Sequence, residues 1–226
     1  MPAAYPQRAF TPPADATEVV LVRHGASQHV TPGQRFELLD GRGDPPLAPE
    51  GREQAEAVAE RLAAEELHGL FVTPLRRTIE TAAPLAARTG LEPTAVAELT
   101  EIGLGEWDGG ELRIRAAHRD PLYFRVIEAE RWDVIPGAEP MEEFADRVAR
   151  GLDMIIEAAG PGATVAAVVH GGVIGELCRQ ATGSRPFAFV HADNTSITRL
   201  VALPGGRRLL RSFNDTAHLA RVEAVA

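Results

Sequence analysis

Two short apolar segments that lie far apart in the chain each end at a histidine. Glu18–Arg23 is rich in valine and precedes His24, and Ala163–Val169 precedes His170. Runs of this length and composition are typical of strands buried inside a sheet. Helical patterns separate the strands, and this alternation indicates a mainly parallel sheet with helices on its faces.

The rest of the pattern predicts a three-layer α/β sandwich with a mainly parallel central sheet flanked by helices. Apolar residues recur at helical spacing after Pro49, over Leu75–Arg88 and over Glu142–Ala159. We expect the second helix to bend or break near Pro84. Further strands are expected over Leu70–Thr73 and Pro93–Leu99, with a hairpin formed by Ile197–Leu203 and Arg207–Phe213.

We predict one domain over residues 18–226, preceded by a flexible leader over residues 1–17. A chain of 226 residues can bury one sizeable core. The leader has four prolines and no continuous apolar run, so we predict neither a signal peptide nor a membrane anchor. The glycine-rich segment at about 108–140 is expected to form an insert that caps the functional site.

Composition narrows the choice of partners. The net charge of -9 and the pI of about 5.3 argue against nucleic acids and anionic membranes as partners. Cys178 is the single cysteine, which excludes an intramolecular disulfide and suits the cytoplasm. All 23 basic residues are arginines, so mechanisms that need a lysine are excluded. A homodimer is left open by the sequence.

The two histidines are predicted to lie at one edge of the sheet. In open parallel sheets, ligands bind beyond the carboxyl ends of the strands, where His24 and His170 both stand. The segment Thr73–Arg77 places another arginine where a strand passes into a helix. Arg23 and Arg77 have the geometry to bind a phosphate group through paired N–H donors.

A carboxyl group completes a set of residues suited to phosphoryl transfer. Glu101 lies in a glycine-rich segment, and Glu106 in the same segment is the second candidate. The set then holds a histidine nucleophile, cations that match the phosphoryl oxygens, and an acid for the leaving oxygen. The sequence shows no close spacing of histidines and carboxylates of the kind that binds a metal, so no metal or cofactor is predicted.

Five blocks in this order resemble the histidine phosphatase superfamily, in its phosphoglycerate-mutase-like branch. Thr73 stands where serine is commoner in that family. The resemblance covers about residues 19–213. The blocks are Leu21–Gly25, Asp44–Ala55, Thr73–Ala82, Leu99–Gly109 and Val168–Gly172.

The resemblance implies a role for each candidate residue. His24 attacks phosphorus, and Glu101 protonates the leaving oxygen and later activates water. His170 takes part in catalysis and, with Arg23 and Arg77, binds the phosphate and its transition state. Ser27 and Gly171 are further phosphate-binding candidates. The implied activity is hydrolysis of a small phosphorylated substrate through a phosphohistidine, without a metal.

Three departures from the family pattern affect this interpretation. Ala26 replaces a common acidic residue, and Val30 replaces an asparagine that binds phosphate in many members; Gln28 or His29 is available as a substitute. The mutases keep that asparagine and add a pair of adjacent arginines after the acid, whereas this insert has only dispersed arginines. A mutase-type phosphotransferase and a phosphate-binding protein of low activity remain alternatives. The dispersed arginines are Arg113, Arg115, Arg119, Arg125 and Arg131.

Overall fold

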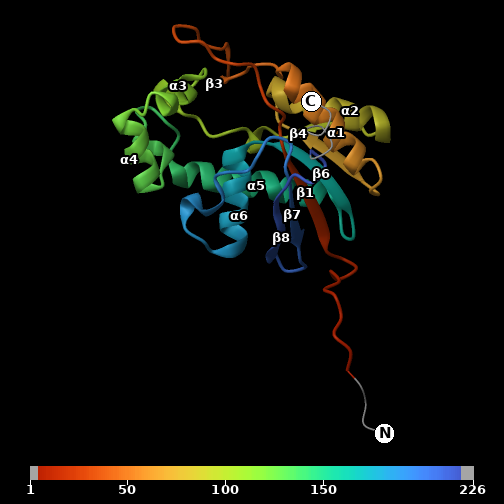
Figure 1. Ribbon diagram of the computed structural model, residues 1–226. Coiled ribbons are helices and arrows are strands. Elements are labelled where there is room, and N and C mark those ends of the chain that lie inside the picture. The colour runs from red at the N-terminus through yellow and green to blue at the C-terminus, as the bar shows by residue number, and fades with distance from the viewer. Residues whose placement is uncertain (1–4, 220–226) are drawn as a thin grey trace.

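The computed structural model describes residues 5–219 and contains a six-stranded sheet with helices on both faces (Figure 1). The strand order is β5-β4-β6-β1-β7-β8, and the first four strands of that order are parallel. The predicted sandwich with its mainly parallel sheet is confirmed. The six strands are β1 (Thr17–Arg23), β4 (Gly69–Val72), β5 (Thr94–Ala95), β6 (Thr164–Val169), β7 (Ile197–Ala202) and β8 (Arg208–Asp215).

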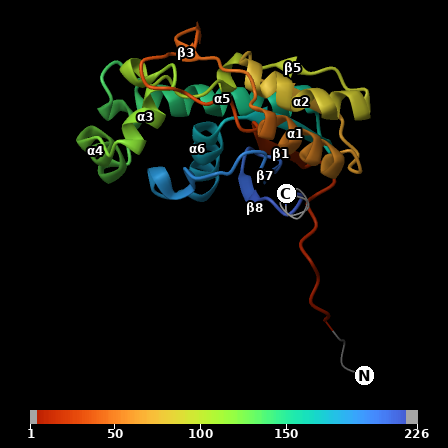
Figure 2. The same cartoon turned by 45° about the horizontal axis from the view of Figure 1, so that its top comes forward.

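Alternate residues of the central strands divide the core into two halves. In β1, Val19 and Leu21 pack on one face of the sheet, and Val20 and Val22 pack on the other. The first face is covered by helices α5 (Met141–Ala159) and α6 (Gly171–Thr182), and the second by α1 (Pro49–Leu62) and α2 (Arg76–Thr89). Figure 2 shows α1 and α2 lying side by side over the sheet. The central strands β1 and β6 are therefore buried on both faces of the sheet, as their apolar composition predicted.

Two elements of the structure differ in detail from those predicted from the sequence. The helix α2 runs without a break through Pro84. Pro84 is partly exposed, so water can bond the carbonyl that loses its helical partner, and buried Ala82 and Leu85 hold the helix on the sheet. The predicted strand over Pro93–Leu99 is shortened to β5, because the chain turns into the 3-10 helix η1 (Ala97–Leu99), where Leu99 is buried.

The edge opposite β5 is the predicted hairpin of β7 and β8. Both strands are antiparallel to their neighbours, and the turn contains Gly205 and Gly206 with φ of 87° at each. A second, two-stranded hairpin lies between β1 and α1 and consists of β2 (Leu38–Leu39) and β3 (Arg42–Gly43). Among residues 5–219, no helix is both long and apolar enough to cross a membrane.

The insert that the sequence left without clear elements is largely helical. It contains η2 (Gly105–Trp107), α3 (Glu111–Ala117), α4 (Pro121–Ala129) and η3 (Trp132–Val134). Trp107, Val126 and Ile135 form a small core of their own within it. In Figure 1 and Figure 2 the helices α3 and α4 lie together at the end of the molecule remote from α2. We call residues 105–135 the cap.

The described part of the leader adds little to the core. Residues 5–13 lead away from the sheet in Figure 1. The strand β1 begins at Thr17, one residue before the predicted domain boundary, and Ala16 and Thr17 are both buried.

Candidate active site

His24 directly follows β1, at the carboxyl edge of the sheet. Its backbone N–H donates to the Val169 carbonyl of β6 (3.0 Å), and its own carbonyl accepts from the Asn194 side chain (2.8 Å). The ring Nδ1 lies 2.8 Å from the Gly25 carbonyl oxygen, which can only accept, so Nδ1 carries the ring proton. Nε2 therefore keeps a lone pair, and Arg77 Nε lies 3.1 Å from it.

The environment of His24 keeps its imidazole neutral. Burial lowers the pKa of His24 well below its ordinary value, and the positive charges of Arg77 and Arg23 lower it further. A neutral imidazole with a lone pair at Nε2 is the form in which histidine acts as a nucleophile, and in this structure that lone pair accepts a hydrogen bond from Arg77 Nε.

His170 lies beside His24, because β6 is the parallel neighbour of β1. The two ring centroids are 5.3 Å apart. His170 Nε2 is 2.9 Å from Thr73 Oγ1, which follows β4, while its Nδ1 is buried and has no hydrogen-bond partner in residues 5–219. Burial, followed by the charges of Arg77 and His24, lowers the pKa of His170 well below its ordinary value. An unused polar atom is thus held next to the His24 ring.

Two arginines flank the histidines. Arg23 ends β1 and donates from Nη1 to the Ala192 carbonyl, and its buried Nε has no partner in the described part of the chain. Arg77, near the start of α2, donates from Nη1 to the Gly43 carbonyl (2.8 Å). Burial lowers the pKa of Arg23, and it lowers that of Arg77 to about 10, so both guanidinium groups stay charged near neutral pH. Positive charge and a free donor therefore meet at the carboxyl edge of the sheet.

Glu101 is fixed at the first turn of α6. Its Oε2 accepts from the Gly172 N–H (3.1 Å), and its Oε1 accepts from the Ile102 N–H (3.0 Å). A β-carbon at Gly172 would lie 2.5 Å from Glu101 Oε1, so only glycine allows this close approach. The carboxylate is thereby held next to the histidine that precedes α6.

A partly buried ion-pair network holds the loop that carries Glu101. Arg147 on α5 donates to the Thr100 and Glu101 carbonyls at 2.7 and 3.1 Å, and Arg42 donates to the Glu101 carbonyl at 2.8 Å. Both arginines also pair with Glu139, at 2.6 and 3.1 Å. The sequence analysis missed this network, because its members come from three separate segments and match no spacing rule.

Arg113 of the cap is the site residue that the sequence analysis did not select. It was one of five dispersed arginines in the insert, and it alone of the five lines the cavity beside His24. Arg113 Nη2 donates to Ser27 Oγ (2.6 Å) and Nη1 donates to the Gln28 carbonyl (3.0 Å). Ser27 itself lines neither lobe of the cavity described below, so its hydroxyl stands behind the guanidinium rather than at the surface of the cavity.

Most of the candidate residues line a cavity of two connected lobes, whereas His170 is fully buried behind it and lines neither lobe. One lobe of about 180 Å³, here called the phosphate lobe, is lined by seven charged or titratable side chains. A second lobe of about 370 Å³, the cap lobe, shares Arg23, Glu101 and Arg113 with it and is also lined by Gly171. The seven side chains of the phosphate lobe are Arg23, His24, Arg42, Arg77, Glu101, Asp108 and Arg113.

Several other predicted candidates lie elsewhere. Glu106 is exposed on η2 and lines neither lobe. Gln28 and His29, considered as substitutes for the missing asparagine, line a separate hollow of about 430 Å³. Arg76 is exposed on α2, as expected for the neighbour of Arg77. Residues 5–219 contain no group of three or more histidine, cysteine, aspartate or glutamate side chains arranged to hold a metal ion.

The family is decided by comparison with known proteins. The sequence profile of the histidine phosphatase superfamily (branch 1) matches residues 19–216. The chain belongs to that superfamily. This histidine phosphatase is 32% identical over 211 residues to phosphoglycerate mutase-like protein 4 of Arabidopsis thaliana, with 91% of this chain and 88% of the relative covered.

Two further relatives are more informative about activity. A bifunctional protein of Mycobacterium tuberculosis is 32% identical over 206 residues, which cover 90% of this chain but only 55% of the relative, so this histidine phosphatase spans about half of that protein. The structure of a mycobacterial glucosyl-3-phosphoglycerate phosphatase superposes with a TM-score of 0.71 at 27% identity, covering 89% of this chain and all of that one. Phosphatases are therefore among its relatives, and this histidine phosphatase is a hydrolase.

Proposed function

We propose that this histidine phosphatase cleaves a small phosphomonoester through a phosphohistidine intermediate on His24. One observation carries the proposal. The neutral His24 ring has its lone pair on Nε2, next to two buried donor atoms, His170 Nδ1 and Arg23 Nε, that have no partner in the described residues. Buried polar atoms are almost always hydrogen-bonded, so these two are available to a ligand, and a phosphoryl group supplies acceptors for both.

In the first step, His24 Nε2 attacks phosphorus and the bond from phosphorus to the ester oxygen breaks. The phosphoryl oxygens accept from Arg23, Arg77 and His170, which match the charge spread over them in the transition state. The protonated Glu101 carboxyl group transfers its proton to the leaving oxygen, and the alcohol departs. The nitrogen–phosphorus bond formed in this step replaces the oxygen–phosphorus bond that is lost.

In the second step, water attacks the phosphorus of phosphohistidine. Glu101, now a carboxylate, takes a proton from the water, and the electron pair of the nitrogen–phosphorus bond returns to His24 Nε2. Inorganic phosphate leaves, and Glu101 is again protonated for the next cycle. Two backbone N–H groups hold Glu101 in one position at the edge of the cavity, where it can act in both steps.

We propose that the cations of this reaction are arginines and that no metal takes part. Arg23, Arg77 and Arg113 line the phosphate lobe, with Glu101 as the one carboxylate common to both lobes.

The proposed compartment is the cytoplasm, since the single Cys178 is buried and no intramolecular disulfide can form.

Hydrolysis is favoured over a mutase reaction by the ion pairs of the cap. A mutase must hold a second acidic group of its substrate while the phosphoryl group is returned. Arg115 is paired with Glu111 and Asp120 on the cap, and Arg131 is paired with Asp133. These cations are therefore engaged away from the cavity.

The test uses a rapid quench with 4-nitrophenyl phosphate, whose acidic phenol needs little help to leave. His24→Ala is expected to abolish turnover, because no other group is placed for in-line attack. Glu101→Gln is expected to slow hydrolysis by about 10²–10⁴-fold and to accumulate acid-labile phosphate on the protein. Mass spectrometry should place that phosphate on His24.

A matched control is His29→Ala, which removes an exposed histidine paired with Glu50 outside both lobes. Its turnover should equal that of the natural protein. Phosphate found on His170 instead of His24 would reverse the roles of the two histidines. Undiminished turnover in His24→Ala would refute the phosphohistidine mechanism.

A further inference from the structure

The cap lobe is lined mainly by apolar side chains. Tyr123 and Ile127 come from α4, Leu112 and Ala116 come from α3, and Trp132 from η3 closes one end. Trp132 is anchored by packing against the Phe187 ring at 4.9 Å between centroids, so this wall belongs to a packed structure. The lobe thus offers a surface that is preformed for an apolar group.

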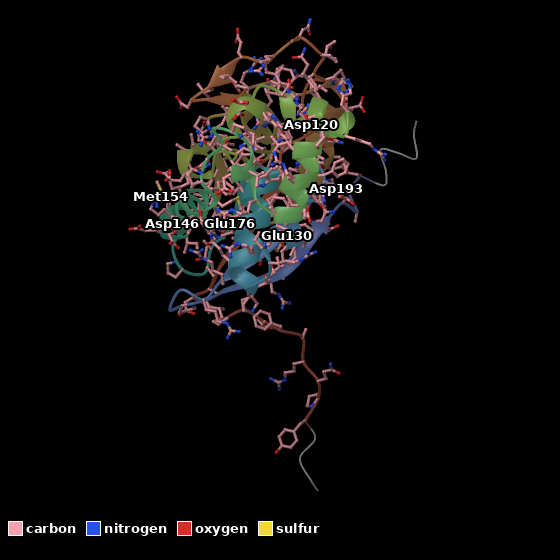
Figure 3. The ribbon with its side chains drawn as sticks, turned by 90° about the vertical axis from the view of Figure 1, so that its left-hand side faces the viewer. Asp120, Glu130, Asp146, Met154, Glu176 and Asp193 are labelled. Atoms are coloured by element: carbon pink, nitrogen blue, oxygen red, sulfur yellow. The ribbon has the colours of Figure 1, made fainter. Side chains whose placement is uncertain are left out.

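The opposite wall is the segment that precedes β7. Val190, His191, Ala192 and Asp193 line the lobe from this side. Figure 3 looks onto the cap: Asp120 and Glu130 mark the two ends of α4, and Asp193, on the segment that precedes β7, lies to one side of that helix. The lobe is therefore a cleft between the cap and the sheet domain, and it is continuous with the phosphate lobe through Arg23 and Arg113.

The cap lobe has no arginine reserved for a second anionic group, and the one histidine that lines it, His191, is near Asp193 in the chain and on the same wall. The two arginines that line it are Arg23 and Arg113, which also line the phosphate lobe. The Arg113 guanidinium already bonds Ser27 and the Gln28 carbonyl. The carboxylate of Asp193 lies on the far wall and adds negative charge there.

We infer that the alcohol portion of the substrate is an apolar group, aromatic or branched, and carries neither a carboxylate nor a second phosphate. This inference rests on the proposed function, which places the phosphoryl group in the phosphate lobe. A carboxylate in the cap lobe would lose its hydration without gaining an arginine of its own, and Asp193, which shares that wall with His191, would repel it. An apolar group would instead replace water against Leu112, Tyr123 and Ile127.

The first test compares two phosphomonoesters of primary alcohols whose leaving oxygens are chemically alike: those of 3-phenylpropanol and 4-hydroxybutanoate. We expect kcat/KM to be about 10–200-fold higher for the phenylpropyl ester, the range by which one group in an apolar pocket discriminates. Equal rates, or a preference for the carboxylated ester, would overturn the inference.

The second test reverses the preference with one substitution. Ile127 is on α4 at the rim of the cap lobe and is 38% exposed, so Ile127→Arg can be accommodated without disturbing a core. We expect it to raise kcat/KM for the carboxylated ester by about 10-fold, as one charge-assisted bond of about 1.4 kcal/mol would. Phe124→Arg is the matched control, because it adds the same charge to the same helix at an exposed site outside the lobe. An equal change in both variants would overturn the inference.

A binding measurement separates this inference from the proposed function. Calorimetry with 3-phenylpropylphosphonate and 3-carboxypropylphosphonate needs no turnover, and we expect the phenyl compound to bind about 10–200-fold more tightly. If 4-nitrophenyl phosphate is not cleaved but this order of affinities holds, the proposed reaction fails and the inference stands. If cleavage is observed and the order is reversed, the proposed reaction stands and the inference fails.

Discussion

Replacement of Thr73 by valine tests how the second histidine is prepared for an anion. Thr73 Oγ1 lies 2.9 Å from His170 Nε2 and 3.0 Å from Thr78 Oγ1, and all three residues are buried. The Thr78 hydroxyl donates to the Thr73 and Leu75 carbonyls at 2.9 and 2.8 Å, so its single proton is engaged there. The Thr73 proton is therefore free to go to His170.

This arrangement controls which nitrogen of His170 carries the proton. A phosphoryl dianion only accepts hydrogen bonds, so His170 Nδ1 must be protonated to bind it. Because burial lowers the pKa of His170, the ring is neutral and Nε2 must then accept a bond, which Thr73 supplies. Valine has nearly the shape of threonine but no hydroxyl, so Thr73→Val leaves Nε2 buried without a donor.

The expected cost follows from that lost bond. Without the Thr73 hydroxyl, the tautomer with Nδ1 protonated loses a buried bond of about 1–3 kcal/mol, and the ring then favours the other tautomer. Selecting the Nδ1-protonated form to bind phosphate would lower kcat/KM by about 5–150-fold. Thermal unfolding should also shift, by about 2–4 °C for each kcal/mol lost.

The assay is hydrolysis of 4-nitrophenyl phosphate at a temperature well below the unfolding transition of Thr73→Val. Thr73→Ser is the matched variant, because it keeps the hydroxyl and should retain most of the activity. If Thr73→Val lowers the unfolding temperature but leaves kcat/KM at the natural level, then Thr73 only stabilises the fold and the reasoning about His170 is refuted. Loss of activity in Thr73→Ser as well would show that the methyl group, not the hydroxyl, is what matters.

Four other outcomes are expected. Phosphatase activity should survive EDTA, and loss of turnover that is restored by magnesium or zinc would contradict the arginine-based mechanism. Stability towards urea should fall as the pH is lowered from about 7.5 to about 5.5. The pKa values of His24 and His170 are lowered in the folded state, so the unfolded chain binds more protons than the folded chain in this window. An unchanged urea midpoint would contradict this prediction. Arg113→Leu should lower kcat/KM for 4-nitrophenyl phosphate by about 10–150-fold, which is the effect of losing a hydrogen bond to a charged group. Exchange of residues 110–135 that keeps Arg113 should instead alter substrate preference and preserve cleavage of 4-nitrophenyl phosphate.

The sheet and its helices were predictable because the sequence pattern and the burial agree. The strands that end at Arg23 and Val169 are buried on both faces, and their composition says so directly. The rule that ligands bind at the carboxyl edge of a parallel sheet then places His24 and His170 together, and their rings are 5.3 Å apart. The local sequence pattern was therefore enough to predict those site residues that regular strands hold in position.

The parts that were missed depend on contacts between distant segments. Arg113 enters the cavity because the cap folds around Trp107, Val126 and Ile135, and nothing in the order of residues distinguishes it from the other arginines of the insert. The network around Glu139 likewise joins segments that are far apart in the chain. Pro84 is the opposite case. The proline predicts a break in the helix, but packing of α2 on the sheet keeps the helix continuous.

The unpartnered donors at His170 Nδ1 and Arg23 Nε have a consequence for the end of the catalytic cycle. In the proposed reaction they bind the phosphoryl group and not the alcohol attached to it, so we expect them to hold inorganic phosphate as well as they hold the ester. Interactions that are equally strong before and after bond cleavage do not speed the chemistry, but they delay departure of the product. We therefore expect release of phosphate past the cap to limit turnover, and added inorganic phosphate to inhibit it.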